Sequence, residues 1–239
     1  MSFLTRTLTA VALMGCWLNA RADLGVERTR VVQVGQSAIS VRVWNDGARD
    51  SLVQTWVDTG DGSVRPEDLK VPYMTVPPMF KLAPGGSRDI LLRRIQAMEL
   101  PQDRESAFWI NILDVPSVAR AEDTLNLDYA VSWRIKLFHR PAGLKGSPEA
   151  AAASLRWGMD RNGATIRLWA RNDSALHVSL AKLGLDGREL ELKPTNALIK
   201  PFSTWSFPLD EEVEGARLEF TWIDDEGIAH RREAVISSP

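Results

Sequence analysis

The chain has 239 residues, enough for one large or two small domains, and 44% of them are apolar and 25% charged, as in ordinary globular proteins. Its formal net charge of −2 at pH 7 does not indicate a surface for nucleic acid or anionic membranes. A single cysteine excludes a disulfide framework, and no uninterrupted apolar stretch reaches the roughly 18 residues that a membrane-spanning helix needs.

The first 22 residues have the pattern of a secretory signal peptide. Arg6 provides a positive start, residues 8–18 are largely apolar, and Ala20-Arg21-Ala22 is a small-residue cleavage site. A second interpretation is a lipoprotein processing site that lipidates Cys16. Cleavage after Ala22 would remove Cys16, so the exported protein would have to fold without any disulfide.

From residue 24 onward, apolar and polar residues alternate in short runs, which predicts strands. The pattern predicts one strand through Val26 and Val32, further strands at 39–43, 52–58, 90–95 and 106–115, and a turn at Gly35. The segment 60–84 contains five prolines, so we expect loops and edge strands there. Its Val76-Pro77-Pro78 run is compatible with a cis bond before Pro77.

One stretch is unusually long for a strand. Every odd position is apolar from Leu125 to Leu137, and all but one of the even positions between them are polar. Thirteen residues at about 3.3 Å each span roughly 43 Å, whereas a usual strand has about 5 or 6 residues. A small domain can cover only part of this apolar face, so the remainder is predicted to meet a second domain or another protein's sheet.

After Pro141 the chain is small and polar, which predicts a linker, and a second group of alternating segments follows. No amphipathic helix of 12 residues is predicted, only a helical turn in the alanines after Pro148. About seven short strands on either side of the linker predict an all-β protein of two immunoglobulin-like sandwiches. We place the domains at residues 23–143 and 144–239, after the signal peptide at 1–22.

Motifs for chemistry are weak. Val57-Asp58-Thr59-Gly60 resembles the catalytic loop of aspartic proteases, but that mechanism needs a second carboxylate loop, and none is present. The three histidines have no metal-binding spacing, and there is no phosphate-binding loop. The sequence therefore predicts no enzyme, no metal and no cofactor. Eight tryptophans follow residue 22; they could line a sugar site, but we expect most of them in the cores.

Two longer motifs together resemble a known family. LPQDRESAFWIN at 100–111 and RIKLFHRP at 134–141 are similar to the paired signatures of the periplasmic pilus-assembly (fimbrial) chaperones. Weaker matches lie at 28–32, 76–85, 200–203 and 223–227. The resemblance extends from about residue 24 to 236 and is more specific in the first half.

The resemblance implies two immunoglobulin-like domains set at an angle with a cleft between them. It implies that Arg30 and Lys136 anchor the C-terminal carboxylate of a pilus subunit. The long strand would complete the subunit's unfinished sandwich, with four donated side chains: Leu125, Leu127, Tyr129 and Val131. Glu105, Arg140 and Asp225 match an ion-pair cluster that bridges the domains.

The resemblance further implies a periplasmic chaperone that binds pilus subunits by donor-strand complementation and delivers them to an outer-membrane usher. No cofactor, nucleic acid or membrane insertion is expected, and an exposed strand also allows the free chain to self-associate. The alternative function is a secreted two-domain adhesin or carbohydrate-binding module that uses its tryptophans.

Overall fold

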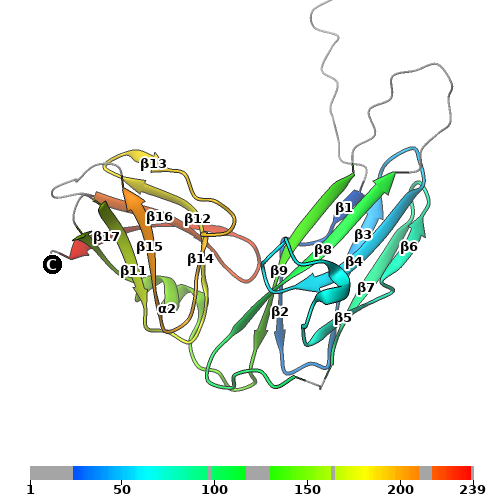
Figure 1. Ribbon diagram of the computed structural model, residues 1–239, viewed down its shortest axis with the longest axis horizontal. Helices are drawn as coiled ribbons and strands as arrows, with labels where there is room; N and C mark the ends of the chain where they lie inside the picture. The colour runs from blue at the N-terminus through cyan, green and yellow to red at the C-terminus, as the bar shows by residue number, and fades with distance from the viewer. Residues whose placement is uncertain (1–23, 96–97, 117–129, 163–164, 210–216, 238–239) are drawn as a thin grey trace, which may run out of the picture.

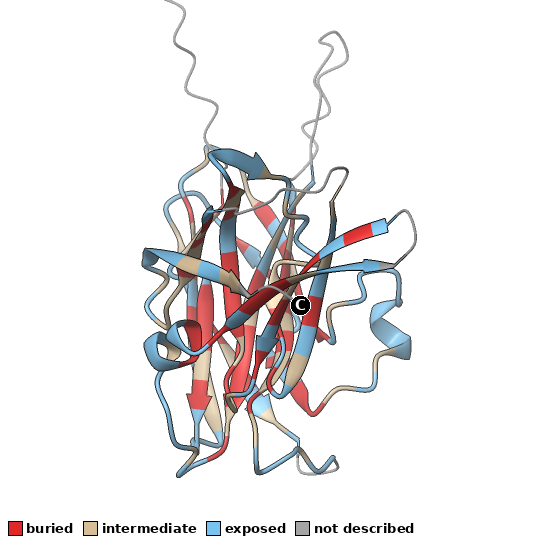
Figure 2. Ribbon diagram, turned by 90° about the vertical axis from the view of Figure 1, so that its left-hand side faces the viewer, coloured by how far each residue is buried: buried red, intermediate tan, exposed pale blue. Residues whose placement is uncertain are grey.

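The computed structural model describes residues 24–95, 98–116, 130–162, 165–209 and 217–237. These residues form two domains of β-strands that lie next to each other at an angle (Figure 1). Each domain has its own cluster of buried apolar side chains, and buried residues follow the middles of the strands while turns are exposed (Figure 2). Two separate cores are expected for two sandwiches that each bury their own apolar faces.

The first domain packs a four-stranded sheet on a five-stranded sheet. The first sheet has the order β1 (Leu24–Val26), β3 (Ala38–Asn45), β7 (Ser87–Arg94) and β5 (Tyr73–Val76). The second has the order β2 (Arg30–Val34), β9 (Val131–Arg140), β8 (Ser106–Pro116), β4 (Ser51–Asp58) and β6 (Met79–Leu82). From β1 to β8 consecutive strands alternate between the two sheets, and β9 then pairs with β8 in the five-stranded sheet.

The prediction of one first strand through Val26 and Val32 is wrong. The chain leaves the first sheet after Val26, and β2 begins in the other sheet at Arg30. In the break, the Glu27 N–H still donates to the Arg42 carbonyl at 3.0 Å, and the Glu27 carboxylate pairs with Arg28. The four consecutive polar residues at 27–30 interrupt the alternation, and they mark the place where the chain changes sheets.

The proline-rich segment forms edge strands, as predicted. β5 lies at the end of the four-stranded sheet and β6 at the end of the five-stranded sheet. The Val76–Pro77 bond between them is cis, and a short 3₁₀ turn covers Pro66–Asp68. Proline lacks the N–H that a central strand needs, which explains why these strands border the sheets.

The second domain begins with α2 (Pro148–Ala153), a single short helix capped by the Ser147 hydroxyl, which accepts from the Ala150 N–H at 3.1 Å. Its strands are β10 (Arg156–Asn162), β11 (Thr165–Asn172), β12 (Val178–Leu185), β13 (Arg188–Leu190), β14 (Leu198–Ile199), β15 (Ser203–Leu209), β16 (Arg217–Ile223) and β17 (Ala229–Ser237). β13, β12 and β16 form one group of neighbouring strands, and β10, β11 and β15 form another. β17 joins the two groups, because it pairs antiparallel with β16 and parallel with β10. No helix among the residues described is long and apolar enough to cross a membrane.

The alternation predicted for the long strand holds in its described part. Ile135 and Leu137 of β9 are buried in the first core and Trp133 packs against that core, while Ser132 and Arg134 on the other face are exposed. This alternation fixes which face of β9 belongs to the sandwich and which carries its charges.

The expectation that most tryptophans lie in the cores is wrong. Of the eight after residue 22, only Trp157, Trp205 and Trp222 are buried. Trp44 and Trp169 instead cover the glycines of neighbouring strands, since a Cβ on Gly25 or Gly158 would lie 2.2 or 2.1 Å from their rings. Their rings therefore fill the space that the missing side chains leave on the sheet surface.

Candidate functional site

β9 is paired along one edge and only half paired along the other. Its whole length from Val131 to His139 pairs with β8, but β2 pairs with it only from Lys136 to Arg140. In the part of the chain that the structure describes, no strand pairs with the other edge of residues 131–135. The switch of the first strand between sheets produces this free edge, because β2 starts only at Arg30.

Arg30 and Lys136 lie side by side at the point where the free edge ends. They are register partners in the parallel β2–β9 ladder, so both side chains leave the sheet on the same face. Arg30 is 7% exposed and its Nη1 donates to the carbonyl of Ile223 in the second domain at 2.8 Å. The Lys136 ammonium forms no hydrogen bond or ion pair with any described residue, so this cation remains available for an anion.

The electrostatics of this pair favour an incoming negative charge. Burial, with a further contribution from the Arg30 cation, lowers the pKa of Lys136 to about 8. Burial also lowers the pKa of Arg30, and the carboxylates of Asp225, Asp224 and Glu105 offset part of that effect. Two partly desolvated cations side by side are costly, and a carboxylate bound between them would relieve the cost through charge-assisted hydrogen bonds.

Glu105, Arg140 and Asp225 come together where the two domains meet. The Arg140 Nε and Nη2 donate to Glu105 Oε1 at 3.0 and 2.8 Å, and its Nη1 and Nη2 donate to Asp225 at 2.8 and 3.0 Å. Burial alone would lower the pKa of Arg140, but its hydrogen bonds to Asp225 and its contacts with Glu105 raise it. One guanidinium thus bridges carboxylates from both domains.

His177 is a fourth member of this interdomain cluster that the sequence did not reveal. Its backbone N–H and its ring Nδ1 both lie 2.9 Å from Glu105 Oε2, and its ring packs on Phe138 at 5.5 Å between centroids. Burial alone would raise the pKa of Glu105, yet the contacts with His177 and Arg140 lower it. A lone histidine just before β12 gave no signal, because only the fold brings it to Glu105.

The proposed donor residues are only partly covered by the structure. Val131 begins β9 and is half-buried beside the free edge. Leu125, Leu127 and Tyr129 lie outside the described residues.

Asp58, the residue of the protease-like motif, is a buried carboxylate that is paired with a cation, which does not suit acid–base catalysis. It is 2% exposed, receives Arg134 Nη2 on both oxygens at 2.8 and 2.9 Å, and accepts from Asn111 Nδ2 at 2.8 Å. No second carboxylate contacts it among the described residues, as a shared-proton dyad would require. Nor does the described part of the chain contain a group of three or more side chains arranged to hold a metal.

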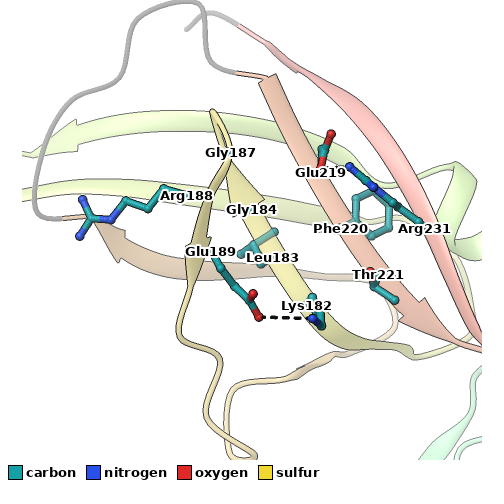
Figure 3. A pocket seen from close by; sticks show the side chains of 10 residues that line it. All are labelled: Lys182, Leu183, Gly184, Gly187, Arg188, Glu189, Glu219, Phe220, Thr221 and Arg231. Atoms are coloured by element: carbon teal, nitrogen blue, oxygen red, sulfur yellow. Dashed lines mark hydrogen bonds and ion pairs between the residues drawn. The ribbon is translucent and has the colours of Figure 1, made fainter.

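The second domain has a separate shallow hollow of about 260 Å³ on its β12, β13, β16 and β17 strands (Figure 3). Its charged side chains pair with one another: Lys182 Nζ lies 3.9 Å from Glu189, and Arg231 pairs with Glu219. Lys182 and Arg231 thus each have an acidic partner in this hollow, whereas Lys136 has none among the described residues.

Family models match both domains that carry the half-paired strand, the adjacent cations and the interdomain ion cluster. Residues 23–145 match the family model described as "Pili and flagellar-assembly chaperone, PapD N-terminal domain", and residues 150–234 match "Pili assembly chaperone PapD, C-terminal domain". The chain belongs to this family of pilus-assembly chaperones.

Individual relatives agree with the family model over nearly the whole chain. The probable fimbrial chaperone YadV of Escherichia coli K12 is 33% identical and covers 95% of this chain and 96% of its own length. The chaperone protein FimB/FhaD of Bordetella pertussis is also 33% identical, over 91% of this chain and 90% of its own.

Solved structures confirm the fold of two immunoglobulin-like domains. The crystal structure of the YadV chaperone has a TM-score of 0.74 at 31% identity, covering 90% of this chain and all of its own. The SafB chaperone, solved in complex with the SafA pilin of Salmonella enterica, has a TM-score of 0.75 at 26% identity and covers 89% of this chain and 96% of its own.

Proposed function

We propose that this protein is a periplasmic chaperone that binds pilus subunits by lending them part of β9, and that it delivers them to an outer-membrane usher. Within the described residues, 131–135 have one edge that pairs with no strand, next to a lysine with no anionic partner there, and this observation carries the proposal. The SafB chaperone in its complex with a pilin is a precedent within the family. The domain limits at 23–143 and 144–239, with a signal peptide at 1–22, belong to the same proposal.

The positions of the cations specify the direction of the guest strand. A strand that pairs with residues 131–135 lies in line with β2 and must stop where β2 begins, at Arg30. If it runs parallel to β9, its C-terminus stops beside Arg30 and Lys136; if it runs antiparallel, its N-terminus does. A terminal carboxylate is attracted to two cations and a terminal ammonium is repelled, so the guest runs parallel.

The guest gains backbone hydrogen bonds along the edge and an apolar side chain from every second position of the donated strand. For Leu125, Leu127, Tyr129 and Val131, burial at about 25 cal/mol per Å² amounts to several kcal/mol, from which the cost of ordering both partners is subtracted. No nucleotide is needed, because the folding of the guest supplies the free energy. Glu105, Arg140 and Asp225 hold the two domains in the orientation that binding requires.

The direct test is coexpression with a pilus subunit from the same bacterium. The wild-type chain should co-purify with the subunit in a 1:1 complex and keep it soluble. A subunit carrying a few extra residues after its natural C-terminus should not be captured, because its carboxylate no longer reaches the two cations. Equal capture of both subunits would contradict the anchoring of the C-terminus.

The donated face can be tested at Val131. Val131→Asp should lower subunit capture about a hundredfold or more, because a carboxylate would enter an apolar groove without a partner. Ser132→Asp is the matched control, since Ser132 is exposed on the other face of the same strand, and it should change capture little. Equal losses in both variants would show that the apolar face of β9 is not what the guest receives.

Binding should weaken at alkaline pH. The free Lys136 has a pKa of about 8, and a bound carboxylate favours the charged lysine, so the pKa rises on binding. Affinity should therefore be constant below pH 8 and fall by up to about tenfold per pH unit above it, because the amine must take up a proton to bind. Dissociation constants of the chaperone–subunit complex, measured at pH 7, 8 and 9, test this expectation. Lys136→Arg should give a flat profile over that range, because arginine stays protonated.

A further inference from the structure

The turn between β16 and β17 contacts the first domain at three points within five residues. The Ile223 carbonyl accepts from Arg30 at 2.8 Å, and the Asp225 carboxylate holds Arg140. Gly227 lies so close to Thr29 that a Cβ on it would be 2.9 Å from the Thr29 hydroxyl oxygen. Arg30 is therefore held by a segment of the second domain as well as by its own strand, and the hairpin can be followed to β2 and β9 in Figure 1.

Asp224 gives this turn its shape. Its Oδ1 accepts from the backbone N–H groups of Glu226 and Ile228 at 3.1 and 2.7 Å, and its own N–H donates to the Ile228 carbonyl at 3.0 Å. Its Oδ2 lies 2.6 Å from His230 Nε2, and the His230 ring stacks on Trp222 at 4.7 Å. The side chain that follows the Ile223 carbonyl is thus fixed on both of its oxygens.

Arg30 depends on that carbonyl. The bond to Ile223 is the only hydrogen bond from its guanidinium to a described residue, and its buried Nε has no partner there. A buried arginine with one fixed acceptor has one preferred orientation, whereas without that acceptor the long side chain has several. The Ile223 carbonyl therefore decides where the remaining N–H groups of Arg30 point.

We propose that Asp224 is a positioning residue of the anchoring pair: it shapes the turn, the turn places the Ile223 carbonyl, and that carbonyl aims Arg30 at the guest's carboxylate. The inference rests on the proposed function, since it assigns a further residue to the same site. It makes anchoring a joint property of both domains, although Arg30 and Lys136 both belong to the first.

The test uses a peptide with the last residues of a pilus subunit, about ten residues or one strand long, as free acid and as C-terminal amide. The wild-type chain should bind the free acid at least about tenfold more tightly than the amide. Asp224→Ala should remove most of this preference by weakening the free acid about tenfold while leaving the amide unchanged. Glu226→Ala is the matched control, because only the backbone of Glu226 contacts Asp224 in this turn.

Gly227→Ala provides a second variant that alters the turn without changing a charge. Its backbone has φ of 88°, which alanine adopts only with strain, and the added Cβ would press on Thr29. Gly227→Ala should also reduce the preference for the free-acid peptide over the amide. If Asp224→Ala fails to fold, Gly227→Ala becomes the test of the proposal. A wild-type preference in the folded variants would overturn the role of Asp224 while leaving the anchor intact. No preference in the wild-type chain would instead overturn the anchor itself.

Discussion

Replacing Lys136 by alanine is expected to abolish subunit capture while leaving the chaperone at least as stable as before. Removing one partner of a desolvated, hydrogen-bonded charge pair costs about 2–5 kcal/mol of binding, or roughly 30- to several-thousandfold in affinity. The folded chain gains no stability from the charge of this lysine, because burial lowers its pKa to about 8 and so disfavours the charged form. Thermal unfolding should therefore occur at the same temperature or a higher one.

Lys182→Ala is a suitable control, since that lysine is exposed on the second domain and makes only a loose ion pair. It should change neither capture nor unfolding. Arg30→Ala should also abolish capture, although it additionally breaks the bond to Ile223 and is a less clean probe. Full capture by Lys136→Ala, measured by co-purification and titration, would defeat the assignment of the anchor.

Replacing Glu105 by alanine should have the largest effect on stability. The carboxylate is 3% exposed and bonds Arg140 and both the backbone and the ring of His177, so its loss leaves buried donors unpaired. Such a change typically costs about 3–5 kcal/mol, which corresponds to a fall of roughly 6–20 °C in melting temperature for a chain of this size. Asp103→Ala is the control, because Asp103 forms an exposed pair with Arg104.

The same variant has a predictable pH dependence. The folded pKa of Glu105 lies below its ordinary value of about 4.3, so its stabilisation is fully present above that value. It is lost as the pH falls through the folded pKa, and the melting temperatures of the wild type and Glu105→Ala should converge there. A difference that persisted unchanged at pH 3 would show that packing, rather than charge, carries the contribution of Glu105.

Much of the fold could be predicted from local sequence pattern, and much of the site could not. The alternation through Ile135 and Leu137 correctly predicted which face of β9 is buried, since a strand repeats every two residues. The break between Val26 and Arg30 was missed: four polar residues at 27–30 interrupt the alternation, but only tertiary pairing shows that the chain moves to another sheet there.

The candidate site shows the same division. Arg30 and Lys136 are 106 positions apart in the sequence, and no periodicity relates them. Only the family resemblance predicted that they lie together, and the β2–β9 ladder shows that they do. His177 and Asp224 were missed because neither belongs to a recognisable motif. Their roles depend on contacts that form only in the folded protein. Tryptophans were misplaced because a sheet surface with glycines can also hold large rings.

The late start of β2 has one more consequence. Because β2 occupies the edge of β9 from Lys136 onward, a guest strand can extend along that edge only as far as Arg30. The molecule thereby contains a built-in stop, and the alignment of any bound strand is counted back from its last residue. Two guest strands with unrelated sequences would therefore pair with β9 in the same register, provided that both end in a C-terminal carboxylate at this position.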